Sequence, residues 1–131
     1  MPAGIASRGE ELISPEGLRI DGRRANETRR ISCELGVLHA DGSAYLEQGN
    51  TKVLVRVTGP HEATHRSKER HDRALIVCEF AALPSASGQY RQQSRTDRAS
   101  VEIAAAIRKV FEPVVQAQLY PRTQIDVSIS L

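Results

Sequence analysis

Cysteine is scarce in this sequence, which contains only Cys33 and Cys78. Neither belongs to a CxxC pair, and neither has a histidine or cysteine at metal-ligand spacing. A disulfide between them and a cysteine zinc site therefore both lack support. Both residues lie in apolar, strand-like runs, so we expect buried free thiols in a reducing compartment.

Long apolar runs are also missing. No segment approaches the ~20 apolar residues that are needed to span a membrane. Residues 1–14 hold only scattered apolar side chains and do not resemble a secretory signal. We therefore expect an intracellular, soluble protein with no membrane partner. Its 131 residues, 40% hydrophobic and 26% charged, are enough for one globular domain.

An excess of one charge sign is absent as well, because the formal net charge is only +2. Arginine and lysine nevertheless cluster in three stretches, Arg19–Arg30, Arg66–Arg73 and Arg91–Arg98. These stretches lack apolar periodicity, so we expect them in surface loops or chain ends. Clustered arginine on loops is typical of phosphate contacts, and a solvated charged surface is the equally open alternative.

The sequence pattern predicts an N-terminal arm, residues 1–30, followed by one domain over residues 31–131. The arm is rich in glycine, proline and charge and cannot form a central strand. In the domain, alternating apolar residues predict strands near residues 31–38, 43–47, 53–58 and 125–131, with turns at Asp41-Gly42 and Gly49-Asn50 and a strand end at Gly59-Pro60. The continuous apolar run 74–82 predicts a central strand.

One helix is expected to begin at Thr96 or Asp97 and to end near Glu112, because Pro113 cannot continue it. Its predicted apolar stripe consists of Ile103, Ile107, Val110, Phe111 and Val114. A helix about 10 Å wide covers roughly half of a five-stranded sheet about 20 Å wide. The remaining apolar strip therefore needs another element or another chain.

The segment His61–His65 reads HExxH, the pattern of zinc proteases. That chemistry needs a helix with an apolar side and a third ligand farther along the chain. Here the segment follows Gly59-Pro60 and runs into a charged stretch, which favours a charged loop beginning at His61. No Walker-type phosphate loop and no paired-carboxylate spacing is present, but Arg91–Arg98 leads into a helix N-terminus and could bind an anion.

Four ordered segments together resemble the RNase PH-type ring subunits of the RNA exosome: Ser14–Arg24, Ala40–Lys52, Gly59–Glu62 and Tyr120–Asp126. The resemblance runs from about Ser14 to the end of the sequence, and Gly-Pro-His-Glu recurs in that family at a strand end. It implies an α+β, two-layer RNase PH-like fold with a mixed β-sheet backed by helices. This chain would supply the first half, with about five strands and one main helix.

The resemblance further implies a subunit of a six-membered ring that passes RNA through a central channel. Its partners would be RNA, other RNase PH-like ring subunits, cap subunits and a hydrolytic nuclease. It would support 3′–5′ RNA degradation and rRNA processing in the nucleus, nucleolus and cytoplasm. The predicted RNA-binding residues border the channel neck or lie at the RNA-contacting loop and helix start: Arg66, Lys68, Arg70, Arg91, Arg95 and Arg98.

Active members of the family hold inorganic phosphate with an arginine three residues before the glutamate of the helix's first turn. Counting back from Glu102, that position is Ala99 here, and Arg98 would point about 100° away around the helix. The family's other catalytic residues lie in a glycine-rich segment after the last strand, where this sequence ends. We therefore expect no catalytic residue, metal or cofactor. An active phosphate-dependent exoribonuclease, with inorganic phosphate as reactant, and a stand-alone basic RNA-binding module are the alternatives.

Overall fold

The computed structural model describes residues 13–82 and 97–131 and divides the chain into two compact units, Met1–Arg30 and Ile31–Leu131. The described part of the first unit consists of successive reverse turns, closed by bridges between Ile13 and Arg19 and between Leu18 and Arg24. The ion pair between Arg23 Nε and Asp21 Oδ2, 2.6 Å long, lies in one of these turns and lowers the pKa of Asp21. Short-range polar contacts therefore shape the described part of this unit.

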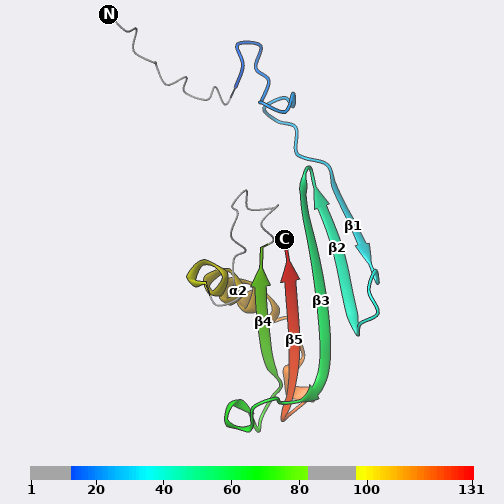
Figure 1. Ribbon diagram of the computed structural model, residues 1–131, viewed down its shortest axis with the longest axis vertical. Coiled ribbons are helices and arrows are strands. Elements are labelled where there is room, and N and C mark those ends of the chain that lie inside the picture. Colours follow the sequence, from blue (N-terminus) through cyan, green and yellow to red (C-terminus); the bar gives the residue numbers. More distant parts are fainter. Residues whose placement is uncertain (1–12, 83–96) are drawn as a thin grey trace, which may run out of the picture. The chain divides into compact units, whose positions relative to one another are not determined.

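Over the described residues, the second unit is a five-stranded mixed sheet with one long helix (Figure 1). Its strands are β1 (Ile31–Leu35), β2 (Gly42–Gln48), β3 (Thr51–Glu62), β4 (Leu75–Ala81) and β5 (Thr123–Ser130). The helix is α2 (Arg98–Phe111), and 3-10 turns occupy Arg66–Lys68 and Ala117–Leu119. The strand order is β1-β2-β3-β5-β4, antiparallel except for the parallel pair β4 and β5.

The predicted antiparallel meander and the last strand are confirmed, but the predicted end of the third strand is wrong. β3 continues through Gly59-Pro60 to Glu62, so His61 lies in a strand rather than in a loop. The pairing with β5 shifts register between Thr58 and His61, which accommodates the proline. A Cβ atom at Gly59 would lie 2.7 Å from the backbone oxygen of Gln124, so this close approach requires glycine.

The core lies where α2 packs on β4, next to β5 (Figure 1). Its buried residues are Phe80, Ala82, Ala104, Val127 and Ile129, and partly buried side chains of β3, including Val55, pack against them. The predicted helix stripe is partly wrong, because Ile103, Val110 and Val114 are exposed. Buried Ser100 and Ala104 occupy the packed face instead, since small side chains allow the helix backbone to approach the sheet.

β4 was predicted to be a central strand, but it lies at the end of the strand order. Its continuous apolar run still has a structural cause, because Ile76 and Phe80 are buried and the alternating Leu75 and Val77 are half-buried. The helix above β4 and the parallel pairing with β5 together produce the burial that a central position would have produced.

β1 lies at the opposite end of the sheet, and all five of its residues are exposed. The prediction of two buried thiols is therefore wrong for Cys33, while Cys78 is half-buried near α2 and burial raises its pKa. Leu35 is 80% exposed, so the expectation that one helix covers only part of the sheet is confirmed. No helix among the described residues is long and apolar enough to cross a membrane.

Candidate nucleic-acid interface

The structure places four of the six predicted RNA-binding residues. Arg66 and Lys68 form the exposed 3-10 turn, Arg70 follows two residues later, and Arg98 is the first residue of α2. Arg91 and Arg95 lie outside the described residues, so their RNA contacts stay predictions. The four predicted RNA-binding residues that the structure describes come from two segments, the loop of residues 63–74 and the start of α2.

The positively charged side chains of the loop differ in whether they form ion pairs. Within the described ranges, Arg66 and Lys68 form no ion pair, and both are exposed. Arg70 Nε lies 3.8 Å from Asp72 Oδ1, so its charge is partly compensated. Arg66 and Lys68 are therefore the residues of this loop that are most available to a phosphate group.

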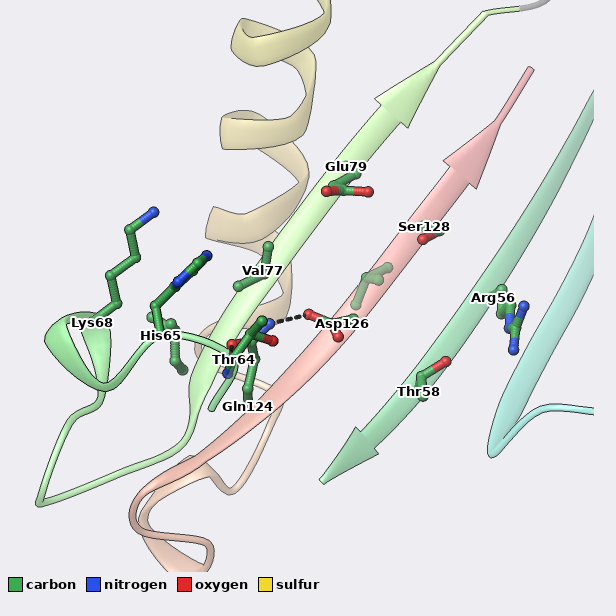
Figure 2. A pocket seen from close by; sticks show the side chains of 12 residues that line it. Arg56, Thr58, Thr64, His65, Lys68, Val77, Glu79, Gln124, Asp126 and Ser128 are labelled. Atoms are coloured by element: carbon green, nitrogen blue, oxygen red, sulfur yellow. Dashed lines mark hydrogen bonds between the residues drawn. The ribbon is translucent and has the colours of Figure 1, made fainter. Parts of the chain in front are cut away.

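Lys68 also lines a groove of about 490 Å³ on the sheet face opposite α2 (Figure 2). Thr64 and His65 accompany it on the loop side of the groove, and Arg56 and Thr58 of β3 lie on the other side. Between these two sides lie residues of β4 and β5, namely Val77, Glu79, Asp126 and Ser128. On β5 these polar residues alternate with the buried core residues, so period-two alternation places them in the groove.

The groove is cationic at its sides and anionic between them. Arg56 and Lys68 lie on opposite sides, whereas the carboxylates of Glu79 and Asp126 lie between them. Asp126 lies against His61, so its charge is partly compensated. Lys68 is exposed at the loop side of the groove, and a phosphate would therefore be attracted to that side.

A polar network anchors the beginning of the loop. His61 Nε2 lies 2.7 Å from Asp126 Oδ2, and Asp126 Oδ1 accepts a hydrogen bond of 2.6 Å from Gln124 Nε2. Gln124 Oε1 in turn accepts the backbone N–H of Thr64 at 3.2 Å. On the other side, Asp41 Oδ2 accepts the backbone N–H of Gly59 at 2.8 Å. The end of β3, β5 and the start of the loop are thus connected by side chains.

This network also explains the HExxH pattern. His61 and Glu62 lie in β3 rather than on a helix, and the His61 ring contacts Asp126. The two-histidine helical face of a zinc protease therefore does not form here. No cluster of three or more potential metal ligands occurs in the part of the chain that the structure describes.

Arg70 and Lys68 line different cavities. It lines a hollow of about 240 Å³ near the C-terminal end of α2, together with Arg73, Arg108 and Glu112. A hydrogen bond from Arg73 to Asp72, 3.1 Å long, lowers the pKa of Asp72, and Arg108 Nε lies 3.5 Å from Glu112. The three predicted loop cations therefore do not line one surface.

The start of α2 matches the predicted boundary, with Asp97 immediately before it. Arg98 is 94% exposed and lies 3.3 Å from Glu102 Oε1. Ala99 is exposed in the same turn and presents only a methyl group. The anion site expected at this helix end also involves residues outside the described ranges, so it remains a prediction.

Sequence reasoning missed two groove residues, Arg56 and Ser128, and placed Asp126 only in the family segment Tyr120–Asp126, with no paired-carboxylate spacing. The alternation in β3 and β5 carries the signal, because a strand with one apolar face presents its remaining residues on the other. Which polar faces lie side by side depends on the pairing of β3 with β5, and this pairing is not local in sequence.

Comparisons with known proteins agree with this fold. The profile of the 3′ exoribonuclease family, domain 1 (RNase PH) matches residues 27–131. The mouse (Mus musculus) exosome complex component RRP41 is 46% identical over 125 residues, which cover 94% of this chain and 51% of that protein. The chain thus spans about half the length of the curated relatives it matches.

Two solved structures share the fold. Rice (Oryza sativa) Rrp46 matches with a TM-score of 0.67 and 26% identity, covering 86% of this chain and 50% of the other. The Archaeoglobus fulgidus exosome with RNA bound to the active site matches with a TM-score of 0.67 and 27% identity, covering 88% and 48%.

A mixed sheet with the helix α2 on one face, together with these matches, defines an RNase PH-like domain. The chain belongs to the 3′ exoribonuclease (RNase PH) family and is similar, in particular, to the exosome component RRP41. The predicted fold class and the resemblance to exosome ring subunits are confirmed.

Proposed function

We propose that this chain is part of a non-catalytic, RNA-binding ring subunit of the RNA exosome that supports 3′–5′ RNA degradation and rRNA processing. The observation that carries the proposal is the exposed pair Arg66 and Lys68, which lies beside a groove in a domain similar to RRP41. Its partners would be RNA, related ring subunits, cap subunits and a hydrolytic nuclease, in the nucleus, nucleolus and cytoplasm.

The chemistry of the loop fits binding without sequence selectivity. Arg66 and Lys68 offer positive charge to phosphates, which every RNA carries. Lys68 places one of these charges at the loop side of the groove, where the RNA backbone would pass. A conduit that must accept any transcript needs contacts of this kind.

Ala99 supports the non-catalytic part of the proposal. A methyl group cannot coordinate the inorganic phosphate that phosphorolysis uses, and the neighbouring Arg98 already lies beside Glu102. No cofactor is needed for passive binding. Inorganic phosphate would enter only as the reactant of an active enzyme.

The test is RNA binding by the full-length protein, assembled with its ring partners, over a range of salt concentrations. We expect Arg66→Ala with Lys68→Ala to weaken binding of single-stranded RNA and to reduce the salt slope by about 1.4, because each contact with single-stranded phosphate contributes about 0.7. Lys109→Ala, which removes an exposed cation from α2, is the matched control and should leave the slope unchanged. An unchanged slope in the double variant would contradict the proposal.

The same assembly, without hydrolytic nuclease, tests catalysis. With RNA and added inorganic phosphate we expect no nucleoside diphosphates. Their release, rising with phosphate and persisting when only this subunit can be active, would instead show a phosphorolytic enzyme. RNA binding by a protein that never joins a multi-subunit assembly would favour the stand-alone binding module.

A further inference from the structure

The end of β3 places the His61 ring between two hydrogen-bond acceptors. Nδ1 lies 2.7 Å from the backbone oxygen of Glu62, and Nε2 lies 2.7 Å from Asp126 Oδ2. A carbonyl oxygen and a carboxylate oxygen can only accept, so both ring nitrogens must carry a proton for both contacts to be favourable. A neutral imidazole has one N–H, and the observed geometry is therefore that of the imidazolium cation.

A series of hydrogen bonds connects His61 to the loop. Asp126 accepts from the Gln124 side-chain nitrogen, and the Gln124 side-chain oxygen accepts from the Thr64 backbone. Gln124 lines the groove but is only 9% exposed, so its amide depends largely on these two partners. Thr64 begins the loop that carries Arg66 and Lys68 and also lines the groove.

We propose that protonated His61 is a positioning residue that holds the start of the loop through Asp126 and Gln124, and that its deprotonation releases the loop. The effect on RNA binding rests on the proposed function, whereas the effect on the loop itself does not.

Deprotonation must break one of the two contacts. If the remaining proton is on Nε2, the lone pair of Nδ1 faces the Glu62 carbonyl oxygen. If it is on Nδ1, the lone pair of Nε2 faces the Asp126 carboxylate. The tautomer protonated on Nε2 keeps the Asp126 contact but loses the Glu62 one, and the tautomer protonated on Nδ1 repels the Asp126 carboxylate. In both cases the ring loses one of its two anchors, so Asp126, and with it Gln124, is held less firmly.

The charges around His61 favour its cationic form. Asp126 faces it from β5, Asp41 from the turn before β2, and Glu62 is its chain neighbour. The groove that Asp126 lines also holds Glu79 and the positively charged side chains of Arg56 and Lys68, together with His65. The Glu62 carbonyl, then the Asp126 carboxylate and the charge of Asp41, raise the pKa of His61 above its ordinary value of 6.5.

The sign of the pH dependence follows. A group whose pKa is raised by folding stabilises the folded state fully at a pH below its unfolded pKa, here about 6.5. This stabilisation is lost as the pH rises through the pKa of the folded state. The loop should therefore be held below about pH 6.5 and released as the pH rises through the folded pKa of His61.

The experiment is hydrogen exchange of residues 63–74 in the full-length assembled protein, from about pH 6 to about pH 8.5, corrected for intrinsic exchange. The wild type should lose loop protection as pH rises. His61→Lys, which keeps a cation throughout, should retain protection at the alkaline end, and His61→Gln should lack it at every pH. His71→Gln, an exposed histidine of the same loop that does not line the groove, is the control and should behave as the wild type.

Two outcomes would overturn the proposal: equal protection of wild type and His61→Gln at low pH, or a His61→Lys variant as sensitive to pH as the wild type. If the variants fail to fold, a nitrogen NMR titration of the wild-type ring decides instead. A ring that is already neutral below about pH 6.5 contradicts the geometry.

RNA affinity measured over the same pH range separates this proposal from the proposed function. Loop protection that depends on pH, with no RNA binding at any pH, would leave the positioning role intact and reject RNA binding. RNA binding with pH-independent loop exchange would reject the positioning role alone.

Discussion

Strands toward the two ends of the sheet, β5 and β1, share an alternating apolar pattern but differ in burial. Beneath α2, Ile76 and Phe80 of β4 and Val127 and Ile129 of β5 are all less than 10% exposed. At the other end, Ile31 and the rest of β1 are exposed. Alternation therefore identifies a strand, while the element that packs on it decides whether its apolar side chains form a core.

The largest expected effect is a charge placed beneath the helix. Val127→Asp in the full-length protein should abolish folding, because an unpaired carboxylate would replace a side chain that is 2% exposed. Ile31→Asp, at the uncovered end, should change the free energy of unfolding by no more than about 0.5 kcal/mol. Denaturant unfolding measures both. A large loss from Ile31→Asp would mean that something covers β1 in the full-length protein.

Removing volume gives a smaller contrast between the same two ends. Phe80→Ala should destabilise the protein by about 3–5 kcal/mol through lost burial and a cavity, whereas Leu35→Ala should cost less than about 1 kcal/mol. Thermal and denaturant unfolding of the two variants would test this difference. Equal losses would contradict the assignment of the core to β4, β5 and α2.

The mildest test leaves the sequence unchanged. Cys33 is exposed in β1, while Cys78 is half-buried and burial raises its pKa, so a smaller fraction is thiolate near neutral pH. A thiol reagent should modify Cys33 first and Cys78 later, with mass spectrometry identifying each site. Faster reaction at Cys78 than at Cys33 would contradict the assignment of β1 as the exposed end of the sheet.

Local patterns predicted the strands well, because side-chain alternation and turn residues such as Gly49-Asn50 act over a few positions. The first three strands and β5 were recognised in this way. The extension of β3 beyond Pro60 was not, because the register shift that tolerates the proline is made with β5. The end position of β4 depends likewise on pairing between distant segments.

The candidate interface was predictable in part. The exposure of Arg66 and Lys68 follows from a charged segment without apolar periodicity. The separation of Lys68 from Arg70 does not, because a short 3-10 turn and the end of α2 decide which cavity each side chain lines. The contact of His61 with Asp126 was equally hidden, since β-sheet pairing brings these residues together.

The most direct test of the account is photo-crosslinking of RNA to the loop in the full-length protein, assembled with its ring partners. A photoreactive amino acid would replace Ser67, between Arg66 and Lys68, or Ser32, an equally exposed serine of β1. The account predicts RNA adducts from position 67 and none from position 32. Adducts from position 32 alone, or equal yields from both, would contradict the assignment of the RNA contact to this loop.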